Sequence, residues 1–373
     1  MYITIKLELP VNAPPLWEAA YRGDLHRVKS LLGNGADYRE RASTNKCTAL
    51  HVAALHGHKD IVCELVRVAQ AGCYTYNGLN FCNVMDDEDL TPLHYACSRL
   101  MIEVCKMLIQ FGAATSTEAC QYSQPVLYAA CGRDYRHTDG MYGGMYNEPP
   151  DNEKDRIRRM QLQMVQLLLE NGADVSSCEW SGHGMMIWEL AIESHNDTAL
   201  LSLLLNAVAV TRKSIPVSRS GDTIMHYVAK LNYFLSRDDA DIKMLEMLRR
   251  HASRTHNKTL DISTQNHKGN TTLYAACDRD KVDMVRYLLD AGVDPPATRD
   301  SLDNLETASS VEIWAMIVAE FNGREPRNIA FAMATHPRLS ELSRWRSLPS
   351  EVHRELEKHS GRALTWDRTK YES

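Results

Sequence analysis

Apolar residues recur along this chain in pairs of short helical stripes that a glycine separates. Leu50, Ala53 and Ala54 place apolar side chains on one face of a short helix. A turn follows at Gly57, and the apolar residues of 61–66 recur at the spacing of a second helix. The pattern therefore predicts a helix, a tight turn, a second helix and a connecting loop.

The same unit returns, and each copy opens with one signature: threonine, any residue, leucine, histidine, any residue, alanine. The signature is complete at 48–53 and 91–96, and a copy with tyrosine in place of histidine stands at 271–276. With the weaker copies included, the repeat starts fall at residues 14, 48, 91, 125, 186, 223, 271 and 303. Several units close on a glycine, such as Gly35 or Gly292, where a helix end favours a residue that tolerates positive φ. Such a period predicts a stack of units, because one helix pair cannot bury both of its faces alone.

These signatures resemble the ankyrin repeat family over about residues 14–323. The T-P-L-H-x-A opening of that family is present letter by letter at 91–96, and its G-A-D closing at 35–37 and 172–174. The resemblance implies an all-α fold, an ankyrin-repeat solenoid of stacked antiparallel helix pairs with projecting hairpin-like loops and a short helical C-terminal cap. It also implies a non-catalytic scaffold that binds another protein through its concave face and inter-repeat loops.

The unequal spacing of the repeat starts predicts how the chain is divided. We expect an N-terminal extension over 1–13, the repeat domain over 14–323, and a helical cap or adaptor-like tail over 324–373. Within the fourth repeat, the segment 134–155 is predicted to be an inserted loop, because its glycines and prolines oppose a helix.

Composition narrows the class of protein. Lysine and arginine number 42 against 48 aspartates and glutamates, a formal net charge of −6, which disfavours a generally basic nucleic-acid-binding surface. No run reaches the roughly 18 uninterrupted apolar residues of a membrane span, so we expect an intracellular protein, cytoplasmic or nuclear. None of the 10 cysteines forms a C-x-x-C pair. Reduced thiols are therefore expected, with no metal and no cofactor.

Two sets of residues resemble catalytic or metal-binding groups, but each set is expected to have a structural role instead. The resemblance implies that His51, His94 and His226 form hydrogen bonds near the opening threonine and tie adjacent loops together. A second set, six residues after the repeat starts, consists of Cys97, Cys131 and Cys277. A small buried thiol suits close helix packing at that position.

The position eight residues after each start is the main candidate for partner binding. The residues there include Arg22, His56, Arg99, Arg133 and Arg279. In the family this position lies at the exposed end of the inner helix, and arginine holds carboxylates bidentately, so the row is a candidate site for an acidic segment of another protein. Polar side chains that simply face water are the alternative interpretation. Further candidate contacts in the loops are Tyr74, Tyr76, Phe81, Trp180 and His183.

Two other functions remain open. The sequence Leu348-Pro349-Ser-Glu-Val352, followed by Leu356, resembles the opening of an F-box, and 339–344 resembles the start of a SOCS box. These residues favour a ubiquitin-ligase substrate adaptor whose tail contacts a ligase component. The third alternative is an enzyme with a site under the 134–155 insertion.

Overall fold

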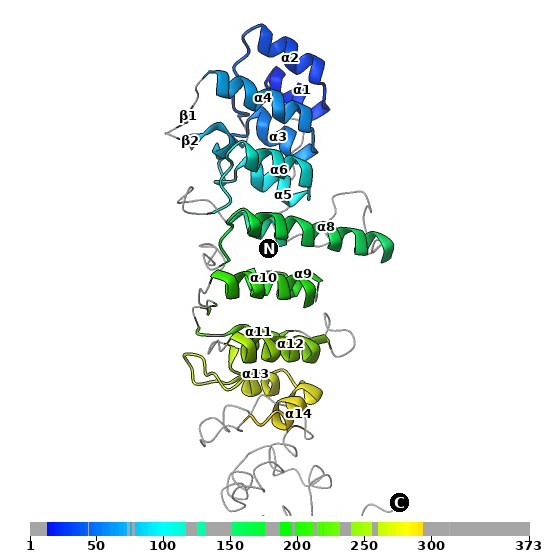
Figure 1. Cartoon of the computed structure of the whole chain (residues 1–373), viewed down its shortest axis with the longest axis vertical. Helices are drawn as coiled ribbons and strands as arrows, with labels where there is room; N and C mark the ends of the chain where they lie inside the picture. Colours follow the sequence, from blue (N-terminus) through cyan, green and yellow to red (C-terminus); the bar gives the residue numbers. More distant parts are fainter. Residues whose placement is uncertain are drawn as a thin grey trace, which may run out of the picture. The chain divides into compact units, whose positions relative to one another are not determined.

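The computed structural model describes residues 13–43, 45–72, 75–76, 79–116, 125–131, 151–175, 187–195, 198–211, 215, 217–218, 220–231, 240–255, 260–293 and 313. The chain forms two compact units, Met1–Pro216 and Val217–Ser373. Both units are built from pairs of helices (Figure 1).

In the first unit, short inner helices alternate along the chain with outer helices. The inner helices are α1 (Pro15–Arg22), α3 (Ala49–His56), α5 (Pro92–Ser98), α7 (Val126–Cys131) and α9 (Ile187–His195). The outer helices are α2 (Leu25–Gly33), α4 (Lys59–Ala71), α6 (Ile102–Gln110), α8 (Asp151–Glu170) and α10 (Thr198–Thr211). Each inner helix packs on the next inner helix, and each outer helix on the next outer helix. This two-layer stack is the architecture that the repeat predicts.

The opening threonine determines where an inner helix begins. The Thr48 side chain accepts a hydrogen bond from the His51 N–H, and the His51 ring accepts one from the Thr48 N–H. This reciprocal capping satisfies two backbone donors that a helix start otherwise leaves without partners. All inner helices of the unit begin one residue after the repeat starts at 14, 48, 91, 125 and 186.

The turn between the two helices of a repeat also contacts the following repeat. Gly23 and Gly57 have φ angles of 74° and 76°, in the left-handed region that glycine adopts without strain. A Cβ atom at Gly23 would lie 2.7 Å from the His58 ring, and one at Gly57 would lie 2.7 Å from Met101 Sδ. His58 and Met101 are the residues that precede α4 and α6, so each turn receives a side chain from the next repeat.

Two connections depart from the simple repeat. The lengthened loop of the second repeat contains a small antiparallel hairpin, β1 (Thr75–Tyr76) and β2 (Leu79–Asn80), followed by the 3-10 helix η1 (Phe81–Asn83).

In the fourth repeat, α8 begins at Asp151, inside the segment 134–155 that the sequence assigns to a loop. The loop prediction is therefore wrong for 151–155. The ion pairs Glu153–Arg156 and Asp155–Arg158 join residues three apart, a spacing that supports a helix.

The second unit repeats the same construction. Its described helices are α11 (Ile224–Lys230), α12 (Ala240–Thr255), α13 (Thr272–Asp278) and α14 (Val282–Asp290). The inner helices α11 and α13 begin one residue after the starts at 223 and 271 and pack on each other, and α12 packs on α14. The eighth start, at 303, and the tail 324–373 lie outside the described residues. Between these two positions the structure describes Ile313 alone, which is buried.

The core of each unit lies between the two helix layers. Leu50 and Leu65 from the two helices of one repeat are fully buried, and burial of a leucine side chain contributes about 1.5–3 kcal/mol. The packing role predicted for Cys97, Cys131 and Cys277 is confirmed, because all three are buried free thiols. Burial raises the pKa of Cys277 to about 12. In the described part of the chain, no helix combines the length and apolar character needed to cross a membrane.

Candidate functional site

The opening histidines join neighbouring inter-repeat loops. His51 Nδ1 accepts the Thr48 N–H at 3.1 Å, and His51 Nε2 lies 3.2 Å from the carbonyl oxygen of Leu90 in the next loop. Because Nδ1 accepts, we assign the ring proton to Nε2, which donates to that carbonyl. Burial lowers the pKa of His51 to about 3, so the ring is neutral at pH 7. His226 repeats the arrangement, with Nε2 2.8 Å from the Asn270 oxygen, so the structural role predicted for these two histidines is confirmed. His94 Nδ1 accepts the Thr91 N–H at 3.1 Å in the same way.

A buried cysteine and aspartate of these loops lie beside a buried tyrosine of α5, a combination that superficially suggests catalysis. Tyr95 Oη donates to Asp86 Oδ2 at 2.6 Å and lies 2.7 Å from Cys47 Sγ. Asp86 Oδ1 accepts the backbone N–H groups of Glu88 and Leu90 at 2.9 and 2.8 Å. Burial raises the pKa of Cys47 to about 12, which keeps the thiol protonated and unreactive. The cluster therefore fixes the loop between the second and third repeats.

A row of polar side chains lies at the C-terminal ends of adjacent inner helices in the first unit. We call Arg22, His56 and Arg99 the inner-helix row. Arg22 ends α1; its side chain is 58% exposed and its Nη2 lies 2.8 Å from Glu18 Oε1. Arg99 follows α5 as its C-cap. Because α3 packs on both α1 and α5, the row runs across three neighbouring repeats.

His56 occupies the middle of this row within a cluster of rings. The Tyr21 ring meets the His56 ring edge-on at a centroid distance of 4.7 Å, and the His58 ring stacks on it at 5.9 Å. Burial lowers the pKa of His56, and the positive charges of His58 and Arg99 lower it further. His56 is therefore a neutral ring between two arginines at pH 7, and its Nε2 atom has no hydrogen-bond partner among the described residues.

The structure brings only part of the predicted contact set together. Arg133 and the loop residues Tyr74, Trp180 and His183 lie outside the described residues, as do Leu348, Pro349, Val352 and Leu356 of the tail. The backbone of Tyr76 belongs to β1. Phe81 is 2% exposed and meets the Tyr38 ring edge-on at 5.3 Å, so it is a core residue and its assignment as a partner contact is corrected.

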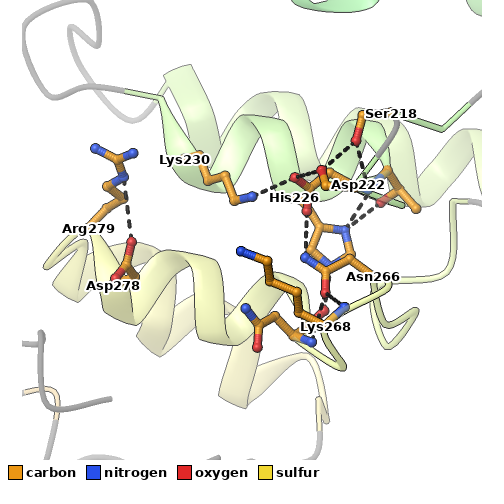
Figure 2. A network of polar contacts seen from close by, with 11 residues as sticks. Ser218, Asp222, His226, Lys230, Asn266, Lys268, Asp278 and Arg279 are labelled. Carbon is orange, nitrogen blue, oxygen red and sulfur yellow. Dashed lines mark hydrogen bonds and ion pairs between the residues drawn. The ribbon is translucent and has the colours of Figure 1, made fainter. Parts of the chain in front are cut away.

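In the second unit, a polar network joins two loops around Asp222 (Figure 2). Its carboxylate accepts hydrogen bonds from Lys230 Nζ at 2.6 Å, Ser220 Oγ at 2.7 Å and Asn266 Nδ2 at 2.7 Å. Burial alone raises the pKa of Asp222, but these hydrogen bonds outweigh it, so the pKa is lowered overall. The carboxylate is therefore ionised and links the loop before α11 to the loop before α13.

Two features of the second unit bear on binding and on stability. Arg279, a predicted contact, is the C-cap of α13, and its Nε lies 3.8 Å from Asp278 Oδ2 (Figure 2). Lys281 Nζ and Asp241 Oδ2 form a buried ion pair at 2.5 Å, with side chains only 5% and 7% exposed. Burial lowers the pKa of Lys281.

Sequence reasoning missed Asp222 and Lys281, because each differs in type from the residue at the equivalent position of the other repeats. Lys281 precedes α14 at the position that His58 and Met101 occupy before α4 and α6. The available signal was a lysine at a position that holds the capping residue Asp24 in the first repeat and the packing residues His58 and Met101 in the next two. A lysine there needs a buried acid, and Asp241 at the start of α12 supplies it.

Two family models match the chain. A model described as ankyrin repeats, in three copies, matches residues 16–119, and a model of a single ankyrin repeat matches residues 268–301. The crystal structure of the human ASB11 ankyrin repeat domain is similar in fold, with a TM-score of 0.50 and 20% identity over 76% of this chain and 100% of that one. At this identity the likeness shows the fold alone.

Two curated proteins share sequence with parts of the chain. It is 32% identical over 113 residues to a putative E3 ubiquitin-protein ligase, XBAT31, of Arabidopsis thaliana, covering 30% of this chain and 25% of that protein. It is 30% identical over 115 residues to alpha-latrocrustotoxin-Lt1a of Latrodectus tredecimguttatus, covering 31% of this chain and 7% of the toxin. The chain thus spans a quarter or less of the length of these relatives.

Proposed function

We propose that this chain, which belongs to the ankyrin repeat family, is a non-catalytic scaffold that binds another protein through the concave side of its first unit. The observation that carries the proposal is the inner-helix row, in which Arg22, His56 and Arg99 come from three consecutive repeats. Aligned across packed helices, they form one continuous contact line for an extended partner segment.

The charge of the row favours an acidic partner segment. Arginine presents a planar fork that holds a carboxylate with two hydrogen bonds, and such charge-assisted bonds are about twice as strong as neutral ones. Glu18 already contacts Arg22, and it also lies 3.4 Å from Arg27. A partner carboxylate therefore exchanges with Glu18 or adds to the exposed side of the guanidinium group.

Charge reversal tests this proposal. Arg99→Glu combined with Arg133→Glu, or Arg22→Glu combined with Arg99→Glu, should weaken binding of a fluorescein-labelled poly-glutamate peptide by tenfold or more, measured by anisotropy at low salt. Each variant should retain the melting temperature of the parent chain within a few degrees. Arg67→Glu is the control, because Arg67 is an exposed arginine on the outer helix α4, away from the row. Equal binding by the row variants and the parent chain would refute the proposal.

A second candidate function is that of a ubiquitin-ligase substrate adaptor. The F-box-like residues Leu348, Pro349, Val352 and Leu356 and the partial similarity to a protein named as a putative E3 ligase support it. Affinity capture followed by mass spectrometry should then recover a ligase scaffold with the parent chain and lose it with Leu348→Ala/Pro349→Ala. Recovery of the scaffold by both forms contradicts this candidate.

A further inference from the structure

The three members of the inner-helix row occupy equivalent positions of consecutive repeats. Arg22, His56 and Arg99 each lie eight residues after a repeat start, at 14, 48 and 91. Helix α3 packs directly on α1 and on α5, and packed helices lie about 8–10 Å apart. A partner segment that follows the row therefore meets another member of the row about every 8–10 Å.

This spacing selects a backbone conformation for the partner segment. In a β-strand, side chains on one face recur after about 6.6 Å and then after about 13 Å. On one face of an α-helix they recur after about 5–6 Å and then after about 10.5 Å. A polyproline II helix has three residues per turn and rises about 3.1 Å per residue, so side chains on one side recur every 9 Å or so. Only the polyproline II repeat falls within the spacing of the row.

The charges of the row favour carboxylates at these recurring positions. Arg22 is an exposed cation at one end, and the partly exposed Arg99 is a cation at the other. Between them, the partly exposed His56 ring meets Tyr21 of α1 edge-on and stacks on His58, the N-cap of α4. Burial lowers the pKa of His56, and the charges of His58 and Arg99 lower it further. A carboxylate beside this ring would offset those charges and stabilise its protonated form.

We propose that the partner segment lies along the inner-helix row as a polyproline II helix and presents a carboxylate at every third residue, one each to Arg22, His56 and Arg99. This inference rests on the proposed function, because it specifies the acidic segment that the row binds. Polyproline II is a major conformation of unfolded chains. An unstructured acidic segment therefore needs little rearrangement to bind, which lowers the entropic cost of association.

Two peptides of the same composition test the spacing. The first contains four copies of Glu-Pro-Pro, and the second contains four consecutive glutamates between two runs of four prolines. Both carry a tetramethylrhodamine label, and their binding to the full chain is measured by anisotropy at low salt. An exposed ion pair changes an equilibrium constant by a factor of about 1.4–5, so two additional contacts should make the spaced peptide bind about fivefold more tightly.

The outcomes separate this inference from the proposed function. Equal binding of the two peptides would overturn the spacing and leave an acidic partner in place, whereas no binding of either would contradict the proposed function and this inference together. Tighter binding of an alanine-rich helical peptide with glutamate at every seventh residue would also overturn the polyproline II assignment.

Substitutions locate the contacts. Arg22→Gln and Arg99→Gln should each reduce the preference for the spaced peptide, whereas Arg67→Gln on the outer helix α4 should retain it. Circular dichroism melts establish that each variant is folded. An unchanged preference in both row variants would place the peptide elsewhere and refute the inference.

The pH dependence of binding tests the middle contact. A bound carboxylate raises the pKa of His56, so binding takes up a proton and the affinity for the spaced peptide should rise between about pH 7.5 and 5.5. The glutamates stay ionised over this range, because their pKa is about 4.3. His56→Gln should remove the pH dependence, and His26→Gln, on the exposed face of α2, should keep it. Persistence of the dependence in His56→Gln would assign the proton to another group and refute the contact at His56.

Discussion

His51 Nε2 lies 3.2 Å from the backbone oxygen of Leu90, a residue 39 positions further along the chain. This hydrogen bond links two successive loops through a ring that also caps its own helix. One side chain therefore determines both where α3 begins and where the next loop lies.

Replacement of His51 should destabilise the first unit. His51→Leu leaves the buried Thr48 N–H without an acceptor and removes the donor to the Leu90 carbonyl, which still accepts the Asp86 N–H. The unsatisfied N–H costs about 1–3 kcal/mol and the lost hydrogen bond about 1 kcal/mol, so we expect a loss of about 2–4 kcal/mol. Urea unfolding followed by circular dichroism measures this change. His26→Leu, on the exposed face of α2, is the control and should change stability by less than about 0.5 kcal/mol.

Stability should fall as the solution is acidified. Burial lowers the pKa of His51 to about 3, from an ordinary value of 6.5, and it also lowers the pKa of His226. The unfolded chain then binds protons that the native chain does not, once the pH falls below 6.5. Stability that is fully present above pH 6.5 is lost toward lower pH, by at most about 1.4 kcal/mol per pH unit for each histidine. Urea midpoints between pH 7.5 and 5 measure the slope, and a flat profile would contradict the assignment of neutral buried rings.

Removal of one partner of the buried ion pair in the second unit should lower the free energy of unfolding strongly. Replacement of both partners by apolar residues should lower it much less. Lys281→Ala leaves the Asp241 carboxylate buried without its cation, which typically costs about 3–5 kcal/mol. Lys281→Met combined with Asp241→Leu removes both charges and should restore most of that loss. Arg250→Ala serves as the control, because its ion pair with Glu246 is exposed and should matter by less than about 1 kcal/mol. Similar losses in the single and double variants would show that the pair is not what stabilises this junction.

The glycine turn before α11 should be sensitive to a methyl group for a steric reason. Gly221 and Gly269 have φ angles of 75° and 77°, so an alanine at either position is strained by about 1–2 kcal/mol. At Gly221, a Cβ would also lie 2.8 Å from the backbone nitrogen of His267, whereas at Gly269 nothing lies within 4 Å. We expect Gly221→Ala to lower the thermal midpoint more than Gly269→Ala does. Equal thermal midpoints for the two variants would show that the loop containing His267 moves aside without loss of stability.

Chemical labelling should distinguish the cysteines by burial. Cys63 is exposed on α4, whereas Cys47 and Cys97 are buried, and burial raises the pKa of both. Iodoacetamide should therefore modify Cys63 in the native protein and should modify the other two only after unfolding, as peptide mass analysis will show. Early modification of Cys47 would indicate that the loop between the second and third repeats opens.

The sequence was sufficient for the repeated part of the fold and insufficient for its exceptions. The starts at 48 and 91 locate α3 and α5 to within one residue, because a threonine cap and a capping histidine act locally. The glycines and prolines of 140–150 predict a loop that extends to residue 155, whereas the charge pairs of 153–158 support a helix from Asp151. The local sequence does not show that Phe81 is buried, because its ring packs against Tyr38, a residue 43 positions earlier that no local pattern connects to it. The inner-helix row was predicted by its repeat position, but the ring cluster around His56 depends on neighbours from other repeats.

The side chains that fill the turns at Gly23 and Gly57 give the stack a fixed order. The His58 side chain packs against the turn at Gly23, and the Met101 side chain packs against the turn at Gly57. The contact between consecutive repeats therefore differs from one junction to the next. Exchange, duplication or loss of an internal module would set an imidazole or a thioether against a turn formed for the other. Evolution or engineering that lengthens this protein should therefore proceed by adding modules at an end or by altering the loops, and not by shuffling its interior.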